Sequence, residues 1–219
     1  MTAKIILFKE NLNWELLKKY SCYISIVRQI KIEKYVDNKR KAIPLMTELL
    51  LRFYLITKMG IQNEKIDFCY NENGKPILLN LENFHFSISH SNSMICIVIS
   101  DFPIGIDTEL CRDVNLNVAK RFFTDEECKQ ILLNTNPSKL FFKIWTQKEA
   151  YIKLFGLSFL ELLRPSKKIK KVHYRYLEFE SYIISVASEK TISKLSVKNI
   201  LLNKVLKIFE REAFINECM

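Results

Sequence analysis

The chain divides into blocks in which hydrophobic residues recur with different periods. Residues Lys4–Phe8 form a short apolar run that predicts a first strand. From residue 13 to residue 58, apolar positions recur every three or four residues, which is typical of amphipathic helices. We expect Pro44 in the first turn of the last of these helices, where its missing N–H would have no partner anyway.

Strand-like segments then dominate as far as residue 110, and the order of helices followed by strands occurs again in the rest of the chain. The turn residues Asn73-Gly74 separate two β-type runs. After Thr124, a predicted helix N-cap, helical segments are followed by strand-like segments through residue 209. We therefore predict an α+β fold with two halves, residues 1–102 and 103–219, each with helices and its own small sheet.

Composition and charge exclude several classes of protein. A chain of 219 residues, 48% of them hydrophobic, can bury a core without disulfides or a structural metal. Its apolar runs fall short of the roughly 20 residues that a membrane span requires. The six cysteines show neither CxxC nor metal-ligand spacing, so we expect free thiols and a cytoplasmic protein.

The net charge of +10 favours an anionic partner without identifying it. Nucleic acid, an acidic protein and a phosphorylated cofactor all stay open at this point. A solvated basic surface with no specific role is also compatible with the composition. Candidate chemistry must therefore come from particular segments.

The segment GIDTE, residues 105–109, places two carboxylates on one face of a predicted strand. Alternate side chains of a strand share a face, so Asp107 and Glu109 lie about 6.6 Å apart along it. Like charges this close favour a cation between them, and oxygen ligands select Mg²⁺, Mn²⁺ or Ca²⁺. Two exposed carboxylates bridged by nearby lysines would give the same pattern.

Three other segments carry candidate chemistry, each with a structural alternative. On a predicted helix, Glu149 and Lys153 are neighbours one turn apart, which suits a cation or phosphate site but is also a common surface ion pair. Ser89 and His90 follow a strand and suit anion binding, or ordinary turn chemistry. Lys75 follows a glycine in what is equally a plain hairpin turn.

The order of these segments is more specific than any one of them. Five motifs follow one another along the chain: NENGKP, FSISHS, GIDTE, KRFFTDEE and WTQKEAYIK. In this order and spacing they resemble the 4′-phosphopantetheinyl transferase superfamily, in its surfactin-synthetase-activating (Sfp-like) branch.

The resemblance implies an enzyme that transfers the phosphopantetheine arm of coenzyme A to a serine of an acyl, peptidyl or aryl carrier protein, with release of adenosine 3′,5′-bisphosphate. It implies dependence on Mg²⁺, with Mn²⁺ as a substitute, and a carrier with an acidic recognition helix. It also implies two similar halves packed as a pseudo-dimer, with coenzyme A in the cleft between them. Because one chain contains both halves, a monomer is expected.

The resemblance also carries over residue roles for the reacting end of coenzyme A. Asp107, Glu109 and Glu149 match the metal carboxylates, and Lys148 and Lys153 match lysines that contact the phosphates. Since three carboxylates and a diphosphate would repel each other, these cations are needed for charge balance. For the base that accepts the proton of the carrier serine, we predict Glu149.

A second set of matched residues would bind the rest of coenzyme A. Lys75, Pro76, Ser89 and His90 match positions lining its site, and Arg40 resembles an arginine near the 3′-phosphate.

Two further expectations concern the base of the reaction and the alternative function. Glu127 is the second candidate for the base, and a basic nucleic-acid-binding module is the alternative function.

Overall fold

The fold is seen in a computed structural model, which describes residues 1–79, 81–114, 116–158 and 170–217. The last cysteine, Cys218, therefore lies outside the described residues. The α-helices and β-strands of the described residues are, in chain order, β1 (Thr2–Lys9), α1 (Trp14–Leu17), α2 (Ile26–Glu33), α3 (Asn38–Met59), β2 (Phe68–Tyr70), β3 (Pro76–Leu78), β4 (His85–Ser91), β5 (Met94–Ser100), β6 (Gly105–Leu110), α4 (Ala119–Phe122), α5 (Asp125–Leu132), α6 (Pro137–Phe155), β7 (His173–Phe179), β8 (Tyr182–Ser188), β9 (Lys194–Asn199) and α8 (Leu202–Glu217).

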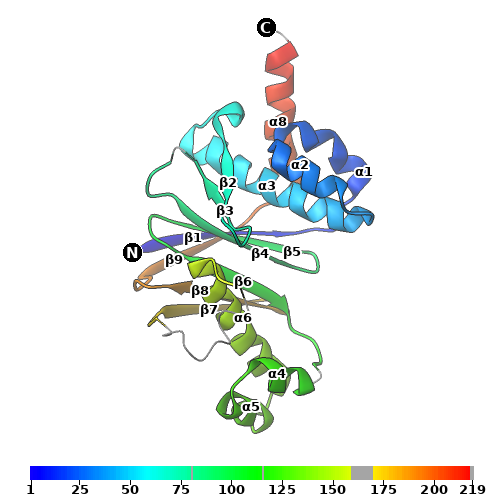
Figure 1. Cartoon of the computed structure of the whole chain (residues 1–219). Helices are drawn as coiled ribbons and strands as arrows, with labels where there is room; N and C mark the ends of the chain where they lie inside the picture. Colours follow the sequence, from blue (N-terminus) through cyan, green and yellow to red (C-terminus); the bar gives the residue numbers. More distant parts are fainter. Residues whose placement is uncertain (80, 115, 159–169, 218–219) are drawn as a thin grey trace.

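The elements stack in four layers, which confirms the predicted α+β class (Figure 1). Helices α1–α3 and α8 cover one face of a four-stranded sheet with the order β4-β5-β1-β9. The other face of that sheet packs on a three-stranded sheet with the order β6-β8-β7, and α6 covers the far side of this second sheet. A small two-stranded hairpin, β2-β3, stands beside the first sheet.

Strand β5 shows why the layers form, because all of its residues are buried. Its odd and even positions face opposite directions. Ile95 and Ile97 pack in the helical core, whereas Cys96 and Val98 pack between the two sheets. A run that is apolar on both faces can only be accommodated between two layers.

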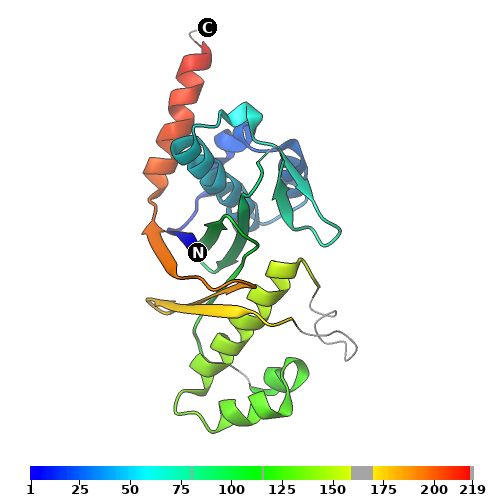
Figure 2. The ribbon, with the colours of Figure 1, turned by 90° about the vertical axis from the view of Figure 1, so that its left-hand side faces the viewer.

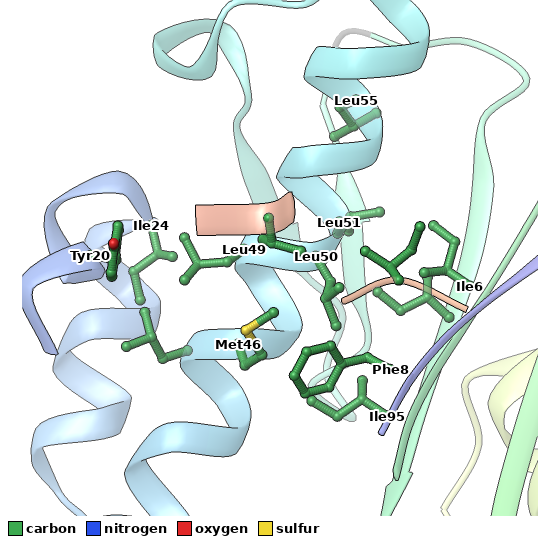
Figure 3. Close-up of a cluster of buried hydrophobic side chains, with 14 of the residues drawn as sticks. Ile6, Phe8, Tyr20, Ile24, Met46, Leu49, Leu50, Leu51, Leu55 and Ile95 are labelled. Carbon is green, nitrogen blue, oxygen red and sulfur yellow. The ribbon is translucent and has the colours of Figure 1, made fainter. Parts of the chain in front are cut away.

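The helical core forms where α3 lies across the first sheet (Figure 3). Met46 and Leu50 of α3 are completely buried, as is Phe8 of β1, and Ile95 of β5 lies beside them. Helix α3 begins at Asn38, capped by the Asp37 side chain, which accepts a hydrogen bond from an amide of the first turn. Because the cap lies so far upstream, the expectation for Pro44 was wrong: this residue lies inside the helix.

The last strand and helix of the described chain return to the elements of the first half (Figure 2). Strand β9 pairs in parallel with β1. Residues 204–209, expected as a strand, belong to helix α8, where Val205 and Phe209 are fully buried in the helical core. Their spacing of four residues is helical, and it puts both side chains on one face.

Both halves have a first strand, then helices, then a hairpin. Strand β1 pairs antiparallel with β5, the second strand of the β4-β5 hairpin. Strand β6 pairs antiparallel with β8, the second strand of the β7-β8 hairpin. Within the part of the chain described, no helix combines the length and apolar character that a bilayer crossing demands.

Candidate active site

The centre of the site lies where helix α6 packs closely against strand β6. A methyl group on Gly105 would overlap the carbonyl oxygen of Ala150 and would lie 2.5 Å from the amide nitrogen of Leu154. Only glycine therefore permits this contact. It sets the helical turn that carries Glu149 and Lys153 against the strand that carries Asp107.

Asp107 is the most enclosed acidic group of the site, with 4% of its surface exposed. Its Oδ1 accepts hydrogen bonds from the Ser89 hydroxyl and from Lys153 Nζ, both at 2.7 Å. Its Oδ2 is buried and has no hydrogen-bond partner among the described residues. A buried carboxylate oxygen without a partner is costly, and it marks a position suited to a ligand.

Glu109 and Glu149 lie near enough to Asp107 to feel its charge. Burial raises the pKa of both glutamates, and the negative charge of Asp107 raises each of them further. Hydrogen bonding and nearby positive charges act in the opposite direction. The Ser91 hydroxyl, 2.7 Å from Glu109 Oε2, lowers the pKa of Glu109, and the charge of Lys153 lowers that of Glu149.

The three carboxylates nevertheless do not converge on one point. Among the described residues, no group of three or more His, Cys, Asp or Glu side chains has the geometry to hold a metal ion. Instead, the ammonium group of Lys153 neutralises Asp107 directly. This arrangement follows from electrostatics, because carboxylates repel one another unless a positive group stands between them. The shared metal site thus stays a prediction.

Lys75 joins the two halves of the site in a way that sequence reasoning did not anticipate. Its Nζ donates to the carbonyl oxygens of Lys153 (2.6 Å) and Leu154 (3.1 Å), at the C-terminal end of α6. Cations stabilise this end of a helix because its carbonyls have no intrahelical donors. Burial lowers the pKa of Lys75, so its ammonium group is held in a poorly hydrated place.

The β2-β3 hairpin makes a second contact with α6. Asn73 Nδ2 donates to the carbonyl oxygen of Gly156 at 2.7 Å. Gly156 ends α6 in the left-handed conformation, as its sequence position indicated, and a side chain there would meet Asn71. The hairpin therefore docks on the helix that carries Glu149 and Lys153.

A cavity of about 210 Å³ lies where these elements meet. Its walls come from both halves: Pro76 and Ile88 on one side, and Ile152 and Lys153 on the other. A second cavity of about 350 Å³ lies on the far side of Lys75, where His85 and Phe155 contribute to its wall. The site thus combines an apolar-walled hollow with a group of charged side chains.

His90 is an exposed residue near the end of β4, close enough to Lys153 and Asp107 to feel their charges. Partial desolvation lowers the pKa of its imidazole, and the positive charge of Lys153 lowers it further. Both effects favour the neutral ring, in contrast to the protonated ring that would pair best with a phosphate.

Lys148 and Glu127 lie together, away from Lys153. Lys148 Nζ is 3.0 Å from Glu127 Oε2, and it lies over the ring of Phe123. The Glu127 carboxylate also completes a capping box with Thr124 at the start of α5, as the predicted cap requires. Since Lys148 and Lys153 are five residues apart, they point about 140° apart around the helix. The structure therefore gives Glu127 a structural role.

Two arginines of the first half lie differently relative to the cavity. Arg40 is exposed near the start of α3. Arg28 of α2, which sequence reasoning missed, lies over the ring of Tyr70 and pairs with buried Glu48. It borders a small gap that Pro76 also lines, next to the cavity. The only sequence signal was a charged residue on an amphipathic helix, which is too common to single out.

Comparison with known proteins identifies the family. One family model, described as the 4′-phosphopantetheinyl transferase superfamily, matches residues 103–187, and another, 4′-phosphopantetheinyl transferase, N-terminal, matches residues 13–101. The chain is 30% identical over 212 residues to the 4′-phosphopantetheinyl transferase gsp of Aneurinibacillus migulanus, which covers 89% of each protein. The chain belongs to the 4′-phosphopantetheinyl transferase superfamily.

Two further relatives agree with this family assignment. The transferase psf-1 of Bacillus pumilus is 32% identical over 141 residues, covering 61% of this chain and 58% of that protein. The transferase Sfp of Bacillus subtilis (strain 168) is 29% identical over 141 residues, covering 64% of this chain and 63% of that protein. The prediction of a phosphopantetheinyl transferase of the Sfp-like type is confirmed, and the cluster on β4, β6 and α6 is its candidate active site.

Proposed function

We propose that this transferase moves the 4′-phosphopantetheine arm from coenzyme A to a serine hydroxyl of an apo carrier protein and releases adenosine 3′,5′-bisphosphate. The observation that carries the proposal is that Lys153 of α6 both pairs with Asp107 of β6 and lines a cavity whose walls come from both halves. The equivalent order of strands in the two halves supports a pseudo-dimer with coenzyme A between them.

The acidic residues fit a hard divalent cation in their chemistry. All donors are carboxylate oxygens, and Asp107 keeps a buried oxygen without a hydrogen-bond partner among the described residues. Asp107, Glu109 and Glu149 would hold Mg²⁺ or Mn²⁺. Bound there, the ion would supply positive charge to the diphosphate and to the leaving phosphate. The long side chain of Glu149 can turn toward Asp107, while the Ser91 hydroxyl holds Glu109 in place.

Residues around the cavity would hold coenzyme A. Pro76 supplies an apolar wall, while Lys75 and Lys153 would supply positive charge for phosphates. Lys148, the third lysine proposed from the sequence, lies beside Glu127 and would have to leave it to reach a phosphate. Ser89 and His90 would contribute a hydroxyl and an imidazole at the end of β4. For the 3′-phosphate, Arg40 is the candidate from the sequence, and Arg28 lies beside the cavity.

The proton of the carrier serine needs an acceptor, and Glu149 is the proposed base. In the metal-free site, burial and the charge of Asp107 raise the pKa of Glu149, so it takes up a proton more readily there than an ordinary glutamate does. In the transfer, the serine oxygen forms a bond to the phosphorus that carries the pantetheine arm. The bond from that phosphorus to the bridging oxygen breaks, and the serine proton passes to Glu149.

The net charge of +10 suits a carrier protein with an acidic recognition helix. A monomer would suffice, since one chain supplies both walls of the cavity. Because exposed charges are screened by salt, we expect rising ionic strength to raise the KM for the carrier more than the KM for coenzyme A.

The test uses mass spectrometry on a panel of apo carrier proteins incubated with enzyme, coenzyme A and Mg²⁺. A mass gain equal to the phosphopantetheine arm supports the proposal, and EDTA should abolish it. The variant Asp107→Asn keeps an oxygen acceptor for Ser89 but loses the charge, so it should lower turnover at least about 100-fold. No mass gain on any carrier would refute the proposed activity.

The nucleic-acid alternative receives no support from the aromatic residues. Binding to single strands relies on exposed aromatic rings on which bases stack. Among the described residues, the strongly exposed large hydrophobic side chains include a single aromatic, Tyr174. Phe8, Phe102 and Phe209 are instead buried in the core.

A further inference from the structure

Three serines join the two sheets along the edge of the site. Ser87, Ser89 and Ser91 alternate on β4, so their side chains share one face. Each hydroxyl accepts a hydrogen bond from a backbone amide of β6, at 3.2 Å in every case: Ile106, Thr108 and Leu110, respectively. Strands β4 and β6 belong to different sheets, so this serine ladder takes the place of a backbone ladder between them.

Two rungs of the serine ladder also bind a carboxylate. Ser89 donates to Asp107, and Ser91 donates to Glu109 Oε2, both at 2.7 Å. A hydroxyl has one proton to donate and lone pairs to accept with, so the amide bond and the carboxylate bond orient it together. The first rung, Ser87, lies opposite Gly105, which has no side chain to receive a bond. Ser91 therefore bonds to both an amide and a carboxylate, whereas Ser87 bonds to an amide alone. The two serines form a matched pair for comparison.

We propose that Ser91 is a positioning residue that orients the Glu109 carboxylate for the divalent cation. The inference rests on the proposed function. Ser91 contacts both the side chain of Glu109 and the amide of the next residue, so it ties the carboxylate to the strand that carries it. Holding one oxygen of a flexible glutamate reduces the conformations that compete with cation binding. Outer partners of this kind tune metal affinity without contacting the metal.

The experiment measures Mn²⁺ binding directly, by electron paramagnetic resonance of free Mn²⁺, with the full chain in the presence of coenzyme A. We expect Ser91→Ala to weaken Mn²⁺ binding about tenfold. Ser87→Ala removes a serine–amide hydrogen bond of the same length but no carboxylate contact. It should therefore lower the free energy of unfolding about as much as Ser91→Ala does, while Mn²⁺ affinity stays as in the natural protein. In turnover assays, Ser91→Ala should raise the half-saturating Mg²⁺ concentration more than the KM for coenzyme A.

The pair Ser91→Thr and Ser91→Val guards against a folding defect, because threonine and valine have the same shape and differ in the hydroxyl. Threonine should restore Mn²⁺ affinity to within about threefold of the natural protein, and valine should not. Equal affinity in the threonine and valine variants, or equal weakening by Ser87→Ala, would overturn the role of Ser91 alone. If the natural protein itself binds no Mn²⁺, the proposed metal site fails as well.

Discussion

Gly105 of β6 lies so close to Ala150 of α6 that a side-chain carbon at residue 105 would overlap the carbonyl oxygen of Ala150. The strand and the helix can approach this closely only because residue 105 is a glycine. This contact sets strand β6 directly against helix α6. Strand β6 supplies Asp107, and α6 supplies Glu149, one residue before the contact. The glycine of the GIDTE segment is therefore a packing residue, and the acidic residues are placed by it.

Replacement of Gly105 by alanine should damage both stability and activity. The new methyl group meets backbone atoms of α6, which cannot rotate away, so the helix must shift. We expect a loss of about 1–3 kcal/mol in the free energy of unfolding, measured by urea denaturation. Gly74→Ala is the comparison, because its site has open space and costs only the strain of a left-handed backbone, about 1 kcal/mol. Equal costs at the two glycines would contradict the packing argument.

The roles of Glu127 and Glu149 can be separated with matched amides. Glu127→Gln keeps an acceptor for the capping box, so we expect turnover within about twofold of the natural enzyme. Glu149→Gln removes the proposed base, and kcat should fall at least about 100-fold. The measurement is the initial rate of carrier modification, followed by mass spectrometry.

Glu127→Ala completes this comparison, because it removes the cap acceptor and should cost about 1 kcal/mol of stability. If Glu127→Gln lost much of its kcat while remaining well folded, Glu127, the second candidate from the sequence, would be the general base in place of Glu149.

The titration of His90 should report the charge of Lys153. A positive neighbour lowers the pKa of an imidazole because it disfavours the protonated ring, so Lys153→Met should raise the pKa of His90. NMR titration of the histidine ring protons, without added metal or coenzyme A, measures this change. An unchanged midpoint would show that Lys153 does not lie where the structure puts it.

Cysteines between the two sheets should react with alkylating reagents much more slowly than cysteines on the surface. Burial raises the pKa of Cys96 to about 12, so at pH 8 only about one thiol in 10⁴ is the reactive thiolate. Cys22 is exposed. We expect iodoacetamide to modify Cys22 in the native protein and Cys96 only after unfolding, as read by peptide mass spectrometry. Rapid modification of native Cys96 would contradict the buried interface between the sheets.

Several features of this fold are determined by residues close together in the sequence. The capping box at Thr124, the end of α6 at Gly156 and the alternation in β6 depend on residues within a few positions of one another, so pattern alone predicts them. The order of the five motifs predicted the family, which the relatives confirm. The start of α3 was misjudged because a proline signal was preferred to the cap at Asp37.

What the tertiary structure decided is which distant groups meet. The pairing of β9 with β1, the docking of Lys75 on the end of α6 and the serine ladder all join residues far apart in the chain. No periodicity encodes such contacts, because they depend on how whole layers pack rather than on neighbouring residues. For the same reason, the sequence assigned Asp107 to a metal ion and Lys153 to phosphates, whereas in the folded chain the two form an ion pair. Opposite charges brought into a poorly hydrated place neutralise each other.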